Sequence, residues 1–415
     1  MGAETAANLG TTPPTQRPNG RIPYFLGCGS DLPVELVDQR DVNRTSRTLC
    51  ALPLLFGGAA ALAPAVSSIG EMLEPVSAVS LPFRGRAFPM ERLAAPFRRI
   101  PSAAESQLSP AAQIAGRHSA GLALRLFTSA GELSVQWDLA EGPLEHPDLA
   151  RSAAAGLDLY LREGESWVPV TVAVPEDNVG NYALLYSGLP SEPREWLLYL
   201  PLAAELDELT FELPPGQSLT PATSEMLDEF PYRAPVVYYG GRLAQGYGAS
   251  RPGRAAGAVL GRAVDREVIN LGLGEGGQLD LAAGALLAEI NAAAFVIDCM
   301  DVASAETIRE RLPNFVRGLR QARPESPIIL VEERPWDAER FHPHLAAERE
   351  ERRQAMRSAF NSLMDRGTTA LYHVRGETLG AGTGDERADA WTLNDLGHKR
   401  HGEVLAAFLG PLIEE

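Results

Sequence analysis

The segment that decides the fold of this chain is PVVYYGGRLAQGYGASRPG, which spans residues 235–253. It opens with a continuously apolar run at 236–239, passes through a glycine-rich turn and leads into an alanine-rich stretch at 254–264. A short apolar run followed by a helical stretch is typical of a β-α unit whose strand is buried on both faces. The segment therefore predicts a parallel sheet that is covered by helices.

The same alternation of strand and helix continues to the end of the chain. Five β-α units predict an α/β fold with a five-stranded parallel sheet, helices on both faces and right-handed crossovers. Folds of this kind bind their ligands beyond the carboxyl ends of the strands. After the first unit, strands are expected at 268–271, 294–298, 328–331 and 370–373, and helices at 281–290, 305–322, 345–366 and 394–409.

Upstream, the pattern changes to short strands at intervals of about ten residues. Apolar and polar residues mostly alternate at 122–127 and 133–139, and further short strands are expected as far as 213. Such spacing suggests an antiparallel β-sandwich or jelly roll, whereas the stretch 66–116 has no clear pattern. We therefore expect an irregular segment at 1–65, a β-sandwich domain at 66–215, a linker at 216–232 and an α/β domain at 233–415.

Composition and charge exclude several classes of protein. The 415 residues include 37 Lys and Arg against 54 Asp and Glu, a formal net charge of −17, so nucleic acid is not expected as a partner. The three cysteines, Cys28, Cys50 and Cys299, are far apart and belong to no Cys/His cluster, so we expect neither a metal site nor a disulfide framework. No apolar run is long enough for a transmembrane span, and the sequence indicates no cofactor.

One segment near the N-terminus has two interpretations. In residues 44–63, two arginines precede an apolar run that ends in the small-x-small pattern of a cleavage site. Basic, then apolar, then small residues are the order of a secretory signal, although about 45 residues precede the run and Pro64 follows it. A buried hairpin or helix is the alternative, so export and a cytoplasmic location are equally expected.

Three blocks at the expected strand ends carry a resemblance to a known family. They are residues 239–253, 270–277 and 389–397. In order and spacing they resemble the blocks of the SGNH, or GDSL-type, hydrolases, which typically contain Gly-Asp-Ser-Ile-Thr-Gln-Gly, Asn-Leu-Gly-Phe-Ser-Gly-Asn-Gly and Asp-Gly-Thr-His-Pro-Asn-Asp-Leu-Gly. Landmarks such as residues 156–160 extend the resemblance to two-domain, carbohydrate-esterase-like members. The resemblance covers roughly residues 115–415 and implies a flavodoxin-like sheet, a preceding β-sandwich and ester hydrolysis.

At most of its chemical positions, however, the sequence departs from the family pattern. The nucleophilic serine of the first block falls on Arg242, and the aspartate before it falls on Gly241. In the second block, the glycine whose amide helps to form the oxyanion hole falls on Glu275, and the asparagine that donates to the oxyanion falls on Gly276. The resemblance therefore implies a pocket from which the nucleophile and an oxyanion donor are missing.

Only one member of the catalytic triad is retained. Asp389 matches the family aspartate, but the catalytic histidine falls on Thr392. A guanidinium stays protonated and cannot act as a nucleophile, and threonine cannot act as a base near neutral pH. Together with Gly240 and Gly274, the substituted positions define a degenerate pocket, and we expect no hydrolysis there.

Two residues could take over catalysis. Ser250 could be a relocated nucleophile, although helix capping or turn formation is its expected role. His398 lies near His401 on the last helix, where a solvated or partly buried face is the simpler interpretation. His342 and His344 have the spacing of metal ligands, but no carboxylates at a suitable spacing could complete the ligand set. A polar loop is therefore expected here.

The sequence thus favours a pseudoenzyme, an inactive esterase that binds a glycan, an acidic small molecule, an active paralogue or another protein partner. An active carbohydrate (acetyl) esterase with relocated catalytic residues is the alternative. We expect Arg242 to pair with Glu275, Asp389 or both and so to fill the former acyl pocket, because a buried charge without a partner is costly. In the two rival interpretations, Arg242 points outward to receive an anionic ligand, or it is a surface residue without a partner.

Overall fold

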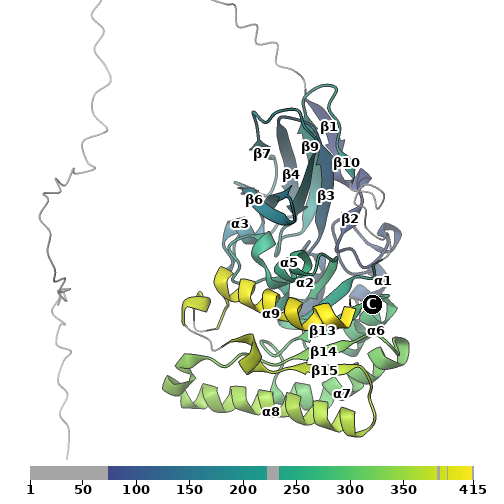
Figure 1. The fold of residues 1–415 in the computed structure, drawn as a ribbon, viewed down its shortest axis with the longest axis vertical. Helices are drawn as coiled ribbons and strands as arrows, with labels where there is room; N and C mark the ends of the chain where they lie inside the picture. The colour runs from purple at the N-terminus through teal and green to yellow at the C-terminus, as the bar shows by residue number, and fades with distance from the viewer. Residues whose placement is uncertain (1–72, 222–232, 381–383, 390, 414–415) are drawn as a thin grey trace, which may run out of the picture. The chain divides into compact units, whose positions relative to one another are not determined.

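The computed structural model confirms the parallel sheet of the C-terminal half. Its five strands lie in the order β12-β11-β13-β14-β15, and neighbouring strands pair in parallel. Every residue of β11, β13 and β14 is buried, since helices cover both faces of the sheet (Figure 1). The strands are β11 (Val236–Gly240), β12 (Val268–Gly272), β13 (Ala294–Asp298), β14 (Ile328–Val331) and β15 (Leu371–Val374).

The two faces of the sheet pack against different helices. Successive side chains of a strand point to opposite faces, and in β13 this separates Phe295 from Val296. Phe295 belongs to a hydrophobic cluster with Phe315 of α7, whereas Val296 clusters with Leu260 of α5 and Leu405 of α9. The helices of this half are α4 (Arg242–Gln245), α5 (Ala256–Ala263), α6 (Leu281–Glu289), α7 (Ala305–Ala322), α8 (Pro343–Asp365) and α9 (Asp395–Ile413).

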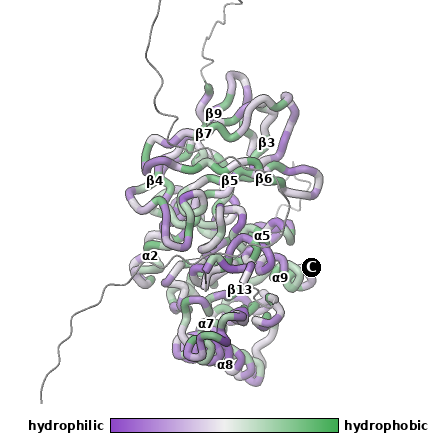
Figure 2. The backbone as a smooth tube through the Cα atoms, turned by 90° about the vertical axis from the view of Figure 1, so that its left-hand side faces the viewer, coloured by the Kyte–Doolittle hydropathy of each residue, from purple (hydrophilic) through white to green (hydrophobic). Residues whose placement is uncertain are grey.

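Two antiparallel sheets form the expected β-sandwich. One has the order β1-β9-β4-β7 and the other the order β10-β3-β8-β5-β6, with β2 paired to β3. Trp137, Trp196 and Phe211 lie in the core between them, and Figure 2 shows hydrophobic stretches along these strands, whereas α8, at the other end of the molecule, is largely hydrophilic. The strands are β1 (Glu74–Ser77), β2 (Phe83–Arg84), β3 (Ala123–Thr128), β4 (Leu133–Leu139), β5 (Leu157–Glu163), β6 (Ser166–Ala173), β7 (Asn181–Tyr186), β8 (Arg194–Tyr199), β9 (Leu206–Leu213) and β10 (Thr220–Pro221).

The stretch without a clear sequence pattern contributes a helix to the α/β half. Besides β1, β2 and the short α1 (Ser102–Glu105), it forms α2 (Pro110–Arg117). Ser109 caps α2 by accepting a hydrogen bond from the Ala112 N–H. Ala112 and Ala115 are buried in the cluster beneath the parallel sheet, so α2 covers the turn that follows β12.

Residues 156–160 and 249–253, which both carry the family resemblance, contact each other where the sandwich meets the α/β half. The carboxylate of Asp158, on β5, accepts hydrogen bonds from Arg251 Nη1 at 2.9 Å and from the Gly253 N–H at 2.8 Å. The guanidinium of Arg251 also lies 5.3 Å from the ring centroid of Tyr160. The side chain of Asp158 is fully buried, so this junction depends on a charged hydrogen bond shielded from water.

The structure describes residues 73–221, 233–380, 384–389 and 391–413. The expected irregular segment, its possible signal region at 44–63 and most of the expected linker lie outside these residues. The described residues belong to one compact unit that begins at Ser68, and the domain boundaries stay a prediction. No helix in the described part of the chain is long and apolar enough to cross a membrane.

Candidate functional site

Arg242 and Glu275 meet at the carboxyl edge of the parallel sheet. Arg242 begins α4 directly after β11, and Glu275 lies in the 3-10 turn Gly274–Gly276 after β12. Because β11 and β12 are parallel neighbours, the two turns open on the same side. Arg242 Nη1 lies 3.6 Å from Glu275 Oε1, as expected from the sequence.

A residue that sequence reasoning missed is the main partner of Arg242. Arg242 Nη2 donates a hydrogen bond to Asp148 Oδ2. Asp148 precedes the short helix α3 (Arg151–Ala154) of the sandwich, and its backbone carbonyl accepts from the Gly248 N–H at 2.9 Å. The guanidinium also lies 4.8 Å from the ring centroid of Tyr247. Arg242 is therefore enclosed by two carboxylates and an aromatic ring and does not point freely to solvent.

Asp389, which the sequence matches to the family aspartate, holds a turn. Its Oδ1 accepts from the backbone N–H groups of Trp391 at 2.7 Å and Thr392 at 2.6 Å, and its Oδ2 accepts from Thr392 Oγ1 at 3.3 Å. Burial raises the pKa of Asp389, but these hydrogen bonds and the nearby Arg242 outweigh burial and lower the pKa overall. Of the two carboxylates expected as partners of Arg242, Glu275 forms the ion pair, and Asp389 interacts with Arg242 through charge alone.

Neighbouring groups occupy the space beside two of the substituted positions. A Cβ at Gly276 would overlap with the backbone nitrogen of Ala112 in α2. A Cβ at Gly241 would overlap with the carboxylate of Asp301, whose Oδ2 accepts from the Leu243 N–H at 2.8 Å and so caps α4. Larger side chains at 241 and 276 therefore require these neighbours to move.

The two fallback residues have other partners. The exposed Ser250 donates from its hydroxyl to Asp395 Oδ2 at 2.6 Å, and its backbone N–H donates to Asp395 Oδ1 at 2.7 Å. His398 Nδ1 accepts from the Ala256 N–H at 3.2 Å, which leaves Nε2 to donate to the Tyr247 carbonyl at 2.8 Å. Burial lowers the pKa of His398 to about 4. The structure thus brings Ser250 together with a carboxylate and His398 together with backbone groups.

His401 and His342 also contact side chains of the fold. His398 and His401 are both buried, so the expected solvated or partly buried helix face is wrong, and His401 Nε2 lies 2.8 Å from Asp298 Oδ2. The ring of His342 stacks on that of Trp336 with centroids 5.6 Å apart. Among the described residues, no group of three or more His, Cys, Asp or Glu side chains could hold a metal ion.

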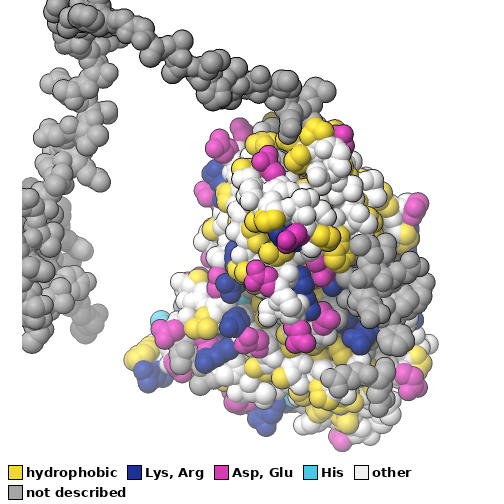
Figure 3. Space-filling view, turned by 45° about the horizontal axis from the view of Figure 1, so that its top comes forward, with side chains coloured by type: hydrophobic (Ala, Val, Ile, Leu, Met, Phe, Trp, Pro, Cys, Tyr) yellow, Lys and Arg dark blue, Asp and Glu magenta, His cyan; other side chains and the backbone are white. Residues whose placement is uncertain are grey.

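A small cavity lies beside Arg242, and Trp391, whose side chain is exposed, lies in its wall. Acidic and basic side chains are interspersed on the face of the molecule drawn in Figure 3. The cavity is lined by Arg242, Leu243, Tyr247, Asp301, Trp391, Thr392 and Leu393.

Two family models match consecutive parts of the chain. The GDSL-like lipase/acylhydrolase family matches residues 233–410, and the N-terminus of SGNH-hydrolase-type esterases matches residues 74–219. The chain belongs to the SGNH, or GDSL-type, hydrolase family. The segments 156–160 and 249–253, which contact each other, each lie within one of the two matched regions.

Solved structures of SGNH proteins share this two-domain arrangement. A structure described as a GDSL-like lipase from Bacteroides ovatus is 27% identical, with a TM-score of 0.76, over 82% of this chain and 98% of that chain. The salicylyl acyltransferase of a tetracycline biosynthetic pathway is 20% identical, with a TM-score of 0.66, over 82% and 99%. A family two carbohydrate esterase from Cellvibrio japonicus is 10% identical, with a TM-score of 0.50, over 82% and 98%. A search of curated proteins found no match.

Replacing Arg242 with methionine is expected to lower the free energy of unfolding by about 1–3 kcal/mol, because Asp148 and Glu275 would lose their shared cation. Urea unfolding followed by circular dichroism measures the change. Arg309→Met is the matched control, since it breaks an exposed pair with Glu351 and is expected to cost less than about 1 kcal/mol. Equal losses in the two variants would show that Arg242 does not hold this SGNH pocket together.

Proposed function

We propose that this chain is a non-hydrolytic SGNH protein that binds a neutral carbohydrate at the mouth of its former acyl pocket. The observation that carries the proposal is the placement of Arg242 at the nucleophile position, held between Asp148 and Glu275. A guanidinium in this setting cannot attack an acyl carbon, because it remains protonated and has no lone pair to offer.

The remaining chemistry of the site supports the same conclusion. Acyl transfer needs a base within reach of the nucleophile and donors aimed at the developing oxyanion. Thr392 supplies no imidazole, and Asp389 is occupied by two backbone N–H groups and the Thr392 hydroxyl. Gly276 has no side-chain donor, and α2 fills the space that an asparagine there would need.

Charge around the cavity favours a neutral ligand over an acidic one. Arg242 is the cation at the pocket, and the carboxylates of Asp148, Glu275 and Asp389 surround it. A second anion would meet this excess of negative charge, whereas hydroxyl groups of a sugar can both donate to and accept from such a rim. The exposed indole of Trp391 offers the flat apolar surface on which sugar rings pack. The structural likeness to carbohydrate esterases is compatible with this ligand class.

No ester hydrolysis above background is expected from the purified protein. Aryl acetate and acetylated xylo-oligosaccharide are suitable substrates, with an active carbohydrate esterase assayed in parallel. Loss of a single triad residue typically lowers turnover by roughly 10⁴–10⁶-fold, and here nucleophile and base are both replaced. Arg242→Ser and the double variant Arg242→Ser/Thr392→His are therefore also expected to stay at background, since the donor position at Gly276 remains blocked.

Turnover by the unmodified protein would contradict the proposal and favour the alternative of an active carbohydrate esterase. Ser250→Ala then identifies the catalyst. Loss of turnover in this variant would make Ser250 a relocated nucleophile, and unchanged turnover would place the nucleophile elsewhere.

The ligand is tested by calorimetric titration with oligosaccharides of matched length. A neutral xylo-oligosaccharide is expected to bind at least about tenfold more tightly than an oligogalacturonate, because like charges in contact disfavour binding. Trp391→Ala is expected to weaken the neutral ligand by a similar factor, whereas Phe341→Ala, at an aromatic residue that is 67% exposed and does not line the cavity, is expected to have no effect. Tighter binding of the acidic oligosaccharide would overturn the proposed ligand class.

A further inference from the structure

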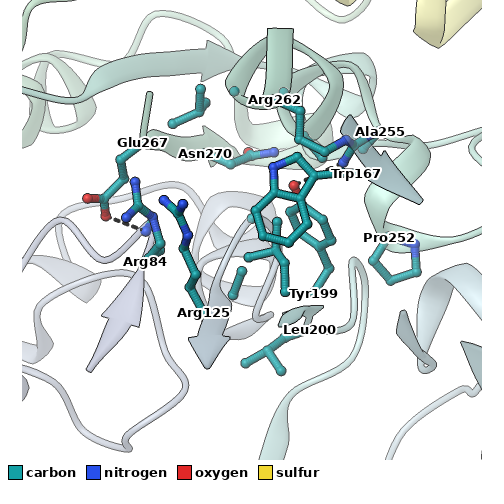
Figure 4. Close-up of a pocket in the computed structure, with 18 of the residues that line it drawn as sticks. Arg84, Arg125, Trp167, Tyr199, Leu200, Pro252, Ala255, Arg262, Glu267 and Asn270 are labelled. Carbon is teal, nitrogen blue, oxygen red and sulfur yellow. Dashed lines mark hydrogen bonds between the residues drawn. The ribbon is translucent and has the colours of Figure 1, made fainter. Parts of the chain in front are cut away.

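A second cavity lies between the sandwich and the α/β half and shares no lining residue with the cavity beside Arg242 (Figure 4). Residues of β3, β6 and β8 form one wall, and α5 with the residues that lead into β12 forms the other. Val268, the first residue of β12, lines this cavity, and Asn270 of the same strand also lies in its wall.

The interior of this junction cavity offers a ring-shaped ligand an apolar surface with aromatic walls. Leu197, Leu200 and Ala258 supply aliphatic surface, and Trp167 and Tyr199 supply the rings. The orientation of the Tyr199 phenol is fixed, because its hydroxyl accepts from Arg262 Nη1 at 2.9 Å. Ligand pockets with apolar walls and a few fixed polar groups are common at junctions between domains.

The charge of the lining is opposite to that of the chain. The chain carries a net charge of −17, yet four arginines and only two carboxylates line the junction cavity. Arg266 and Arg262 are directed to backbone carbonyls as well as to the cavity. The lining arginines are Arg84, Arg125, Arg262 and Arg266, and the carboxylates are those of Asp265 and Glu267.

Two of the arginines gather at one end of the junction cavity. Figure 4 shows the guanidinium groups of Arg84 and Arg125 beside each other, with Glu267 on one side and Trp167 on the other. Glu267 accepts a hydrogen bond from the Gly85 N–H, which holds its carboxylate against the backbone directly after β2. Arg125 donates from Nε to Glu195, and its Cζ lies 5.5 Å from the ring centroid of Trp167. The arrangement places two guanidinium groups, each of which already faces a carboxylate, next to an aromatic face.

We propose that the junction cavity is a binding site for a small aromatic carboxylate, with the ring against Trp167 and the carboxylate directed at Arg84 and Arg125. Guanidinium groups match the planar, two-oxygen geometry of a carboxylate. The partly enclosed site strengthens this attraction relative to bulk water. The ligand would touch both the sandwich and α5, so its binding would stabilise their junction.

The test is calorimetric titration of the full chain with 2-naphthoate, 2-naphthamide and acetate. 2-Naphthoate is expected to bind at least about tenfold more tightly than the neutral amide, since hydrogen bonds to charged groups are the stronger ones. Acetate, which has no ring, is expected to give no measurable heat. Raising the salt concentration should weaken the binding of 2-naphthoate.

Two phenylalanine variants on α5 locate the site without removing an ion pair. Ala258 lines the junction cavity, so Ala258→Phe is expected to fill it and to reduce 2-naphthoate affinity at least about tenfold. Ala263→Phe makes the same change at an exposed position of the same helix and is expected to leave binding unchanged. Equal affinity for the amide, unchanged binding by Ala258→Phe, or no heat with millimolar 2-naphthoate would each overturn the proposal, whatever the outcome of the ester assay.

Discussion

Replacing Asp158 with alanine is expected to lower the free energy of unfolding by about 3–5 kcal/mol, the range found when one partner of a buried ion pair is removed. The Asp158 side chain is fully buried, and that of Arg251 is 15% exposed. Without the carboxylate, the Arg251 guanidinium and the Gly253 N–H lose the acceptor that links the sandwich to the α/β half. Urea unfolding of the full chain measures the loss.

Two further variants make this measurement specific. Glu163→Ala changes an exposed carboxylate on the same strand, β5, and is expected to alter stability by less than about 0.5 kcal/mol. Asp158→Asn keeps the shape of the side chain but removes its charge, so it should fall between alanine and the unmodified chain. An Asp158→Ala protein as stable as Glu163→Ala would show that the junction does not depend on this ion pair.

The second large effect is a loss of stability in mild acid caused by His398. Burial lowers the pKa of His398 in the folded chain from 6.5 to about 4, so between these values the unfolded chain binds the proton and the folded chain does not. Stability is therefore fully present above pH 6.5 and falls as the pH drops toward 4. Because one pKa unit corresponds to about 1.4 kcal/mol, His398 accounts for a loss of about 3 kcal/mol across this range.

Unfolding free energies measured at several values between pH 7.5 and 4 test this expectation. His118, whose pKa is lowered to about 3 by burial and by the neighbouring Arg99 and His146, adds to the slope of the unmodified chain. The His398→Asn variant isolates the part due to His398, and its slope should be smaller by one proton. His342→Asn, at an exposed histidine, should leave the slope unchanged. An undiminished slope in His398→Asn would mean that burial does not hold this imidazole neutral.

Much of the fold was predictable because its signals are local in the sequence. The apolar runs that become β11, β13 and β14 are buried on both faces, so they contain almost no polar residue and are recognisable one at a time. The strand Ala294–Asp298 and the helix Ala305–Ala322 coincide with their expected ranges. The stretch 66–116 was not predictable, because α2 is short and owes its place to packing on the turn after β12.

The candidate site was predictable only where topology brings residues together. Arg242 and Glu275 follow neighbouring parallel strands, so their proximity follows from the order of the β-α units. Asp148 precedes Arg242 by 94 residues, lies outside every motif and has no periodicity that marks it as a partner. Its contact with Arg242 exists because the sandwich packs against the carboxyl edge of the sheet.

By itself, then, the sequence determined the order of strands and helices and the family, and it predicted the positions where catalytic residues are replaced, because these depend on local periodicity and on motif spacing. Only the tertiary structure decided which groups enclose Arg242, that α2 and Asp301 occupy the space beside Gly276 and Gly241, and that Asp158 binds Arg251 across the junction. Such contacts join segments far apart in the chain. Their energies depend on burial and geometry that exist only after the sandwich and the α/β half have packed together.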